Sequence, residues 1–230
     1  MASRPQKTNA RGSTRSRLAI PRAARRCAAL LLCSAVTSVS GATLDADALI
    51  SRLARVPPAT IAFSEARFSP LLTEPLVVSG RLSYLGQGSF DRDLDIPYAE
   101  HTAIRGESVS VERAGEPPRT FALKRAPELG ALLMSFVALL SGDAAAVARE
   151  FTMTASGDTA VWTIELTPMD ARQRRRLQRI VVSGAENEPR CLAVIGQQGG
   201  GSVMLLGESA AAEVSSSTSL EALLQRCSAK

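Results

Sequence analysis

The sequence predicts a mainly β protein with helices, in which one antiparallel sheet curls and receives helices on its concave side. Three observations predict this class. Apolar and polar residues alternate with a period of two in about eleven short segments. Short links join these segments, which favours antiparallel neighbours. One nearly uninterrupted apolar stretch of helical character separates two groups of strands, and the sheet must cover it because that helix has little polar surface.

Residues 1–42 are predicted to be a secretory signal. They contain eight Lys or Arg residues and no acidic residue. A short apolar run follows the charges, and Val39–Ala42 supplies small residues for cleavage. A retained membrane anchor is the alternative. Residues 43–230 are then expected to form a single domain, exported to the periplasm of a Gram-negative bacterium.

The positive charge of the chain belongs to the predicted signal. The full sequence has 27 Lys and Arg against 22 Asp and Glu, a net charge of +5. Without the eight leader charges, 19 basic residues face the same 22 acidic ones, and the net charge becomes −3. We therefore do not expect nucleic acid as a partner.

The expected domain opens with an amphipathic helix over Thr43–Val56, which Pro57-Pro58 ends. In the strand predicted at Pro75–Leu85, apolar residues occupy one face and Ser or Arg the other. The other strands predicted before the apolar stretch are Thr60–Ser69, Ser89–Ile96, His101–Gly106, Ser108–Arg113 and Arg119–Lys124. Those predicted after it are Glu150–Ala155, Ala160–Thr167, Leu177–Ser183, Arg190–Gln197 and Ser202–Gly207.

The apolar stretch is Pro127–Leu140. Proline suits the first turn of a helix, and Glu128 suits the positive end of the helix dipole. The run is far shorter than the roughly 20 residues that cross a bilayer. Two interpretations remain open: an ordinary core helix, or a lid over an apolar cavity. Shorter helices are expected at Ala144–Arg149 and Leu220–Arg226.

Two cysteines lie outside the predicted signal, Cys191 and Cys227. An even pair in an exported protein predicts a disulfide, here one that ties the C-terminal tail to a late strand. Closing a loop of about 36 residues contributes roughly 3.8 kcal/mol in the loop-entropy description. A redox-active pair is the alternative, although the CxxC spacing is absent.

The order of several short motifs is characteristic. They are Phe63-x-Glu65-x-x-Phe68, Gly80-x-Leu82-x-Tyr84, Pro97 with Glu100, Gly106-x-x-Val109, Pro127 before the Leu-rich helix, Leu140-Ser-Gly-Asp143, Phe151 and Trp162-x-Ile-x-Leu166-x-Pro168. With them, the segment from Leu44 to Ser209 resembles the periplasmic outer-membrane lipoprotein carrier proteins, the LolA family, and more particularly its divergent LolA-related branch.

This resemblance implies a half-open barrel of eleven antiparallel strands whose concave face is covered by helices. It also implies a soluble periplasmic carrier or chaperone that works as a monomer. Such a carrier takes the acyl chains of lipoproteins, or another amphiphile, from an inner-membrane donor complex to an outer-membrane acceptor. The turn at Leu85–Gly88 lacks the arginine that the best-known carriers have there, so the resemblance assigns no functional arginine to this turn.

A carrier of acyl chains needs a dry, covered pocket. The predicted lipid-binding residues are Val78, Leu82, Phe121, Leu123, Trp162, Ile164, Leu166, Val194 and Leu206. The predicted lid residues are Leu132, Leu133, Phe136 and Leu140. The alternative is that the same residues fill a solid core, because alternation alone does not distinguish a filled barrel from a hollow one.

A run of arginines is the one concentrated charge outside the signal: Arg172, Arg174, Arg175, Arg176 and Arg179. It predicts either a solvated turn or a docking surface for anionic lipid or an acidic partner.

The sequence does not predict an enzyme, a metal site or a cofactor. His101 is the single histidine, and no serine has a nucleophile-elbow pattern. The alternative to a carrier is therefore a non-carrying periplasmic interaction or sensor module that binds a protein segment in the same groove.

Overall fold

The structure is a computed structural model that describes residues 44–125, 127–211 and 214–228. Within these ranges, the side chains of 127–129, 131, 132, 134, 135 and 228 are not described. The predicted signal and its cleavage site lie outside the described residues, so both stay predictions.

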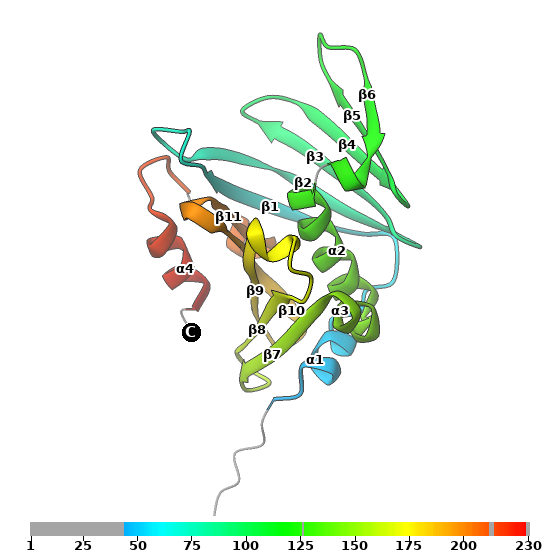
Figure 1. Cartoon of the computed structure of the whole chain (residues 1–230), viewed down its shortest axis with the longest axis vertical. Coiled ribbons are helices and arrows are strands. Elements are labelled where there is room, and N and C mark those ends of the chain that lie inside the picture. Colours follow the sequence, from blue (N-terminus) through cyan, green and yellow to red (C-terminus); the bar gives the residue numbers. More distant parts are fainter. Residues whose placement is uncertain (1–43, 126, 212–213, 229–230) are drawn as a thin grey trace, which may run out of the picture. The chain divides into compact units, whose positions relative to one another are not determined.

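A single antiparallel sheet forms the body of the domain (Figure 1). Within the described ranges it has eleven strands, as the alternation predicted. The strands are β1 (Ala59–Phe68), β2 (Leu76–Gly86), β3 (Ser89–Ile96), β4 (Glu100–Arg105), β5 (Ser108–Arg113), β6 (Arg119–Ala122), β7 (Phe151–Gly157), β8 (Trp162–Pro168), β9 (Leu177–Ala185), β10 (Glu188–Gly196) and β11 (Gly201–Leu206).

The sheet consists of two meanders that join in its middle. Its order is β6-β5-β4-β3-β2-β1-β11-β10-β9-β8-β7. Strands β1 and β11 pair from Phe63 opposite Leu206 to Phe68 opposite Gly201. Strands β6 and β7 form the two edges, so the sheet curls without closing. This arrangement confirms the predicted half-barrel.

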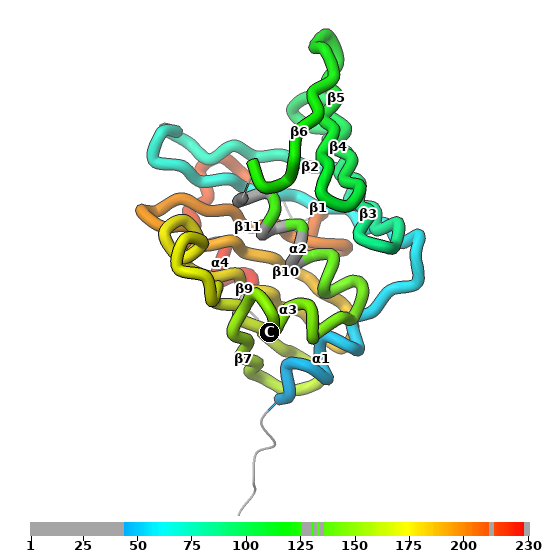
Figure 2. Tube along the Cα trace, turned by 45° about the vertical axis from the view of Figure 1, so that its right-hand side comes forward, coloured from blue at the N-terminus to red at the C-terminus, as the bar shows by residue number. Residues whose placement is uncertain are grey.

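In the part of the chain that the structure describes, four α-helices accompany the sheet: α1 (Ala46–Arg52), α2 (Pro127–Ser141), α3 (Ala144–Glu150) and α4 (Leu220–Ser228). Figures 1 and 2 show α1, α2 and α3 on one side of the sheet and α4 on the other. Side chains cap three of them: Asp45 accepts a hydrogen bond from the N–H of Asp47, Asp143 accepts one from the N–H of Ala146, and the hydroxyl of Ser219 accepts one from the N–H of Ala222.

Two elements are shorter than the sequence predicted. Helix α1 ends at Arg52 rather than Val56, because the N–H of Arg55 donates to the carbonyl of Leu140 (2.7 Å) instead of continuing the helix. Strand β6 ends at Ala122, and the 3₁₀ turn η1 (Leu123–Arg125) leads toward α2.

Buried side chains form two clusters on opposite faces of the sheet. The concave cluster joins residues of all strands with α1, α2 and α3. The convex cluster is smaller and lies under α4. Its buried members are Ala66, Cys191, Ala193, Ile195, Val203, Leu205, Val214 and Leu223.

Candidate functional site

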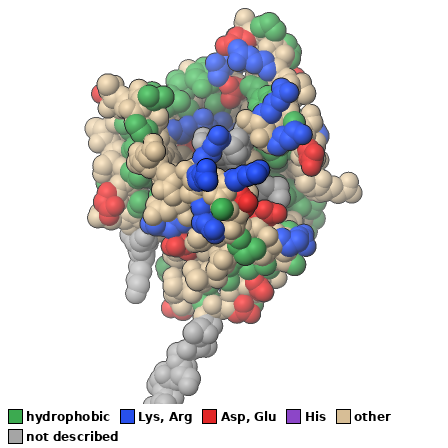
Figure 3. All heavy atoms as spheres, viewed as in Figure 1, with side chains coloured by type: hydrophobic (Ala, Val, Ile, Leu, Met, Phe, Trp, Pro, Cys, Tyr) green, Lys and Arg blue, Asp and Glu red, His purple; other side chains and the backbone are tan. Residues whose placement is uncertain are grey.

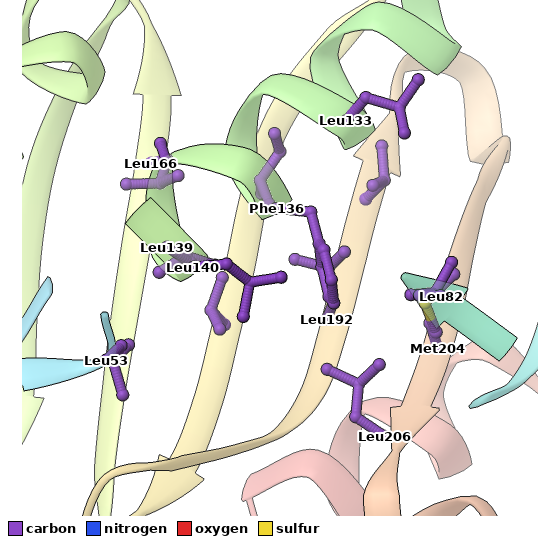
Figure 4. Packing of buried hydrophobic residues seen from close by; sticks show 14 of the residues in the cluster. Leu53, Leu82, Leu133, Phe136, Leu139, Leu140, Leu166, Leu192, Met204 and Leu206 are labelled. Atoms are coloured by element: carbon purple, nitrogen blue, oxygen red, sulfur yellow. The ribbon is translucent and has the colours of Figure 1, made fainter. Parts of the chain in front are cut away.

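Helix α2 covers the concave face of the sheet with apolar side chains. Leu133, Phe136 and Leu140 are all buried, and the ring of Phe136 meets that of Phe90 edge-on, with centroids 5.3 Å apart. Figure 4 shows Leu133, Phe136, Leu139 and Leu140 of the helix extending toward labelled side chains of the sheet. The fourth predicted lid residue, Leu132, has a side chain outside the described part.

The structure brings all nine predicted lipid-binding residues together on the concave face. Seven are buried members of the concave cluster, and Phe121 and Leu123 pack against it half-buried. They come from β2, β6, η1, β8, β10 and β11. The residues in strands thus share one face, as the alternation predicted, and the binding of lipid by these residues stays a prediction. In this structure α2 occupies the space above that face, so the concavity is covered.

The same face carries a buried ion cluster that the sequence analysis missed. Oε2 of Glu65 on β1 accepts hydrogen bonds from Arg92 on β3 (2.7 Å) and from Arg67 (3.0 Å). Glu65 and Arg92 are almost completely buried, whereas the Arg67 side chain is partly exposed. The guanidinium of Arg92 also lies 4.8 Å from the centroid of the Phe63 ring, within range of a cation–π contact.

Burial alone would raise the pKa of Glu65, but Arg67 and Arg92, with a further contribution from the hydroxyl of Ser202, outweigh burial and hold that pKa below its ordinary value of 4.5. Burial has the larger effect on Arg92 and lowers its pKa, although a guanidinium remains charged at neutral pH. Glu65 is therefore ionised inside the concave cluster, with its charge balanced by two arginines.

A cavity of about 780 Å³ lies beside this cluster, and we call it the mouth. Lys and Arg side chains gather around a hollow in the middle of the face seen in Figure 3. Among the described residues, those lining the mouth are Glu65, Arg67, Phe68, Ser69, Pro70, Lys124, Arg172, Gln173, Arg176, Leu177, Val194, Gly196, Gln197, Gln198, Gly200, Gly201 and Ser202.

The structure divides the predicted arginine run among different environments. Arg172 and Arg176 flank the 3₁₀ turn η2 (Gln173–Arg175) and line the mouth. Arg174 donates to the carbonyls of Pro168 and Met169 (3.2 and 2.8 Å). Nε of Arg179 lies 3.6 Å from the carboxylate of Glu165. Docking by the whole run stays a prediction.

The predicted disulfide between Cys191 and Cys227 is present, with the Cα atoms 5.5 Å apart. It connects β10 to α4 on the convex side. The hydroxyl of Ser183 on β9 donates to the carbonyl of Cys227 (2.6 Å), which adds a polar contact to the covalent one.

A second hollow, of about 510 Å³, lies along β2 to β5 and is mostly charged. His101 lines it, with Nδ1 2.7 Å from a carboxylate oxygen of Asp93. Within the described ranges, the structure has no group of three or more His, Cys, Asp or Glu arranged to hold a metal ion. None of the helices described is both long enough and apolar enough to span a bilayer.

An open antiparallel sheet of eleven strands with an apolar helix on its concave face defines the LolA-like half-barrel class. The model of one family, described as outer membrane lipoprotein carrier protein LolA-like, matches residues 38–229. This chain belongs to that family.

Similar solved structures are distant in sequence. A LolA superfamily protein from Nitrosomonas europaea is 10% identical, with 72% of this chain and 92% of that chain covered and a TM-score of 0.41. A putative outer membrane lipoprotein-sorting protein domain from Vibrio parahaemolyticus is 12% identical, with 69% and 87% covered and a TM-score of 0.40. LprF from Mycobacterium bovis is 10% identical, with 75% and 95% covered and a TM-score of 0.32. The search of curated proteins found no match.

Proposed function

We propose that this protein is a soluble periplasmic carrier that binds the acyl chains of lipoproteins or another amphiphile on the concave face and delivers them toward the outer membrane. It acts by burial and release, with no covalent chemistry. By analogy with the family, an inner-membrane donor complex loads it and an outer-membrane acceptor unloads it. The carrier works as a monomer and needs no cofactor.

The observation that carries this proposal is the apolar helix on the concave face. Helix α2 has 15 residues and no charged residue after Glu128. Among the described side chains, no ion pair or disulfide joins α2 to the sheet. A helix held on the sheet by apolar packing can be exchanged for another apolar body of similar size, because the hydrophobic effect is not directional.

The magnitudes agree with such an exchange. Exposing the buried side chains of Leu133, Phe136, Leu139 and Leu140 costs about 6–12 kcal/mol, at roughly 1.5–3 kcal/mol each. An acyl chain of about 15 methylenes gains about 12 kcal/mol on burial, at roughly 0.8 kcal/mol per methylene. One acyl chain therefore offsets the displacement of the helix, whereas spontaneous opening without cargo is rare.

The substitution Phe136→Glu tests this proposal. A carboxylate at this buried position repels apolar cargo and weakens the contact with Phe90. We expect the variant to lose uptake of a fluorescent fatty-acyl probe, measured by titration. The control is Val56→Glu, which places the same charge at a side chain that is 87% exposed and outside the concave cluster. Unchanged uptake in a folded Phe136→Glu protein, as judged by circular dichroism, would contradict the proposal.

Native mass spectrometry of the mature protein, purified from periplasm without detergent, provides a second readout. One acylated species per chain supports the carrier and identifies its cargo class. A ligand-free protein that also fails to take up the fatty-acyl probe favours the alternative, an interaction module that binds a protein segment in the same groove.

A further inference from the structure

We propose that the mouth is a subsite for the phosphate group of an anionic amphiphile whose acyl chains enter the concave face. This inference rests on the proposed carrier function and specifies the cargo. The cargo is a phosphate-bearing lipid, rather than an amphiphile with an uncharged polar end.

The first argument is the number of cations that converge on the mouth. Among the described residues, its lining includes four cationic side chains, Arg67, Lys124, Arg172 and Arg176, against one carboxylate, Glu65. They come from three segments that are far apart in the sequence: the end of β1, the turn η1, and the residues that flank η2. The fold therefore collects positive charge at one place on a chain whose predicted mature form is net negative.

The second argument is that little of this charge is neutralised by the protein. The carboxylate of Glu65 is already bound by Arg67 and Arg92. Lys124, Arg172 and Arg176 form no ion pair with any residue that the structure describes. Among the described residues, these three cations therefore have no carboxylate partner. Guanidinium groups bind phosphate oxygens through paired, charge-assisted hydrogen bonds, so a phosphate suits this set.

The acidic residue next to the η2 turn, Asp170, interacts with the charge of Arg172. Backbone hydrogen bonds, first that from Gln173, and then the Arg172 charge lower the pKa of Asp170. Its carboxylate forms no ion pair with an arginine that the structure describes. Oδ1 of Asp170 accepts hydrogen bonds from the backbone N–H groups of Arg172 and Gln173 (2.8 and 2.9 Å). Those two bonds hold the carboxylate against the backbone of the turn. Asp170 thus fixes the loop that carries Arg172, and it does not line the mouth.

The third argument is the continuity of the mouth with the apolar interior. Leu177 and Val194 line the mouth and are also buried members of the concave cluster. Phe68 and Pro70 add apolar surface to the wall. A ligand bound here has cationic groups at one end and the apolar face at the other. This polarity matches a lipid with its phosphate outward and its chains inward, and it does not match a free anion, which gains nothing from the apolar wall.

The test compares two fluorescent lipids with identical acyl chains, a phosphatidic acid and a diacylglycerol, at equal ionic strength. We expect the mature wild-type protein to bind the phosphatidic acid at least tenfold more tightly. The double variant Arg172→Gln/Arg176→Gln should lose this preference and keep the affinity for diacylglycerol. The matched control is Arg175→Gln/Arg179→Gln, which removes the same charge from residues that do not line the mouth, and it should keep the preference.

Each other outcome overturns the inference in a distinguishable way. Equal affinity of wild type for both lipids rejects the phosphate subsite and leaves the carrier function intact. Binding of inorganic phosphate as tight as that of phosphatidic acid shows a free-anion site, and rejects the role of the apolar wall. Failure to bind either lipid rejects the carrier function together with the subsite. Loss of preference in both double variants shows a general charge effect rather than a site.

Discussion

The two faces of the sheet are both covered by a helix, but the coverings are held differently. On the convex side, α4 packs on the smaller cluster and is tied to β10 by Cys191–Cys227. On the concave side, α2 packs on the larger cluster through apolar side chains such as Phe136 and Leu140. A covalent bond thus fixes the helix over the smaller apolar surface, while apolar packing and one backbone hydrogen bond, from Arg55 to Leu140, retain the helix over the larger one.

This difference indicates where the molecule can change. Displacing α4 requires breaking a covalent bond, so the convex cluster acts as a fixed backing for β9, β10 and β11. Displacing α2 breaks no covalent bond and mainly requires a replacement for its apolar contacts, at a cost of the size that an acyl chain offsets. Three predictions break or sharpen the comparison.

The largest effect is expected from Glu65→Gln, which disrupts the buried ion cluster on the concave face. This change leaves Arg92 buried next to a neutral partner, and loss of one partner of a buried pair typically costs about 3–5 kcal/mol. We expect that decrease in the free energy of unfolding, measured in urea at pH 7. The control is Glu165→Gln, whose partner Arg179 is partly exposed, and a loss below about 1 kcal/mol is expected there.

The same variant has a distinct pH dependence. The pKa of Glu65 is lowered in the folded state, so the ionised carboxylate stabilises the protein above the unfolded-state value near 4.5. That stabilisation is lost as the pH falls below 4.5 through the folded-state pKa. Wild type should therefore lose stability more steeply than Glu65→Gln in this acidic range. Parallel acid profiles for the two proteins would show that Glu65 does not contribute through its charge.

The residues of the concave face were predictable from the sequence, because alternate residues along a strand point to the same face of the sheet. Leu82 and Trp162, for example, could be assigned to one surface without knowledge of which strands are neighbours. The ion cluster had a similar signal that was not used. Glu65 lies two residues after Phe63, and Arg92 lies two residues after Phe90, so each shares a strand face with a buried aromatic residue. Opposite charges therefore occupy apolar-face positions on two early strands.

The mouth was not predictable in this way. Arg67, Lys124 and Arg176 approach one another only because β1 pairs with β11, which joins the N-terminal and C-terminal meanders. Alternation within a strand contains no information about that non-consecutive pairing. The arginine run was visible in the sequence, but its division between the mouth and other contacts depends on the η2 turn.

The second prediction concerns the disulfide that holds α4 on the convex side. In Cys191→Ala/Cys227→Ala the chain loses the cross-link, and the loop-entropy description gives a loss of about 3.8 kcal/mol. The melting temperature should fall accordingly, as measured by differential scanning calorimetry. Uptake of the fatty-acyl probe should be unchanged at temperatures where the variant remains folded, because the concave cluster is untouched. Loss of uptake in the folded variant would show that the two faces are coupled.

The smallest effect is expected on the concave side, from the substitution Gly130→Ala in α2. Gly130 has no positive φ, and an added Cβ would lie 3.5 Å from the nearest atom of Leu123, an ordinary contact. Alanine favours a helix over glycine by about 1 kcal/mol, so the melting temperature should rise by about 2–4 °C. The control is Gly184→Ala on β9, where an added Cβ would clash with the carbonyl oxygen of Glu188 and with the Trp162 ring and should destabilise the protein.

The rate of lipid uptake by Gly130→Ala then distinguishes two ways in which α2 can leave the sheet. If α2 unwinds when it leaves the sheet, the added helix propensity resists opening, and stopped-flow uptake of the fatty-acyl probe should slow about fivefold, the factor that corresponds to about 1 kcal/mol. If α2 moves away as an intact helix, alanine stabilises the covered and the displaced positions equally, and the uptake rate stays unchanged. Because α2 has almost no polar surface to expose as a free helix, we expect the slower rate.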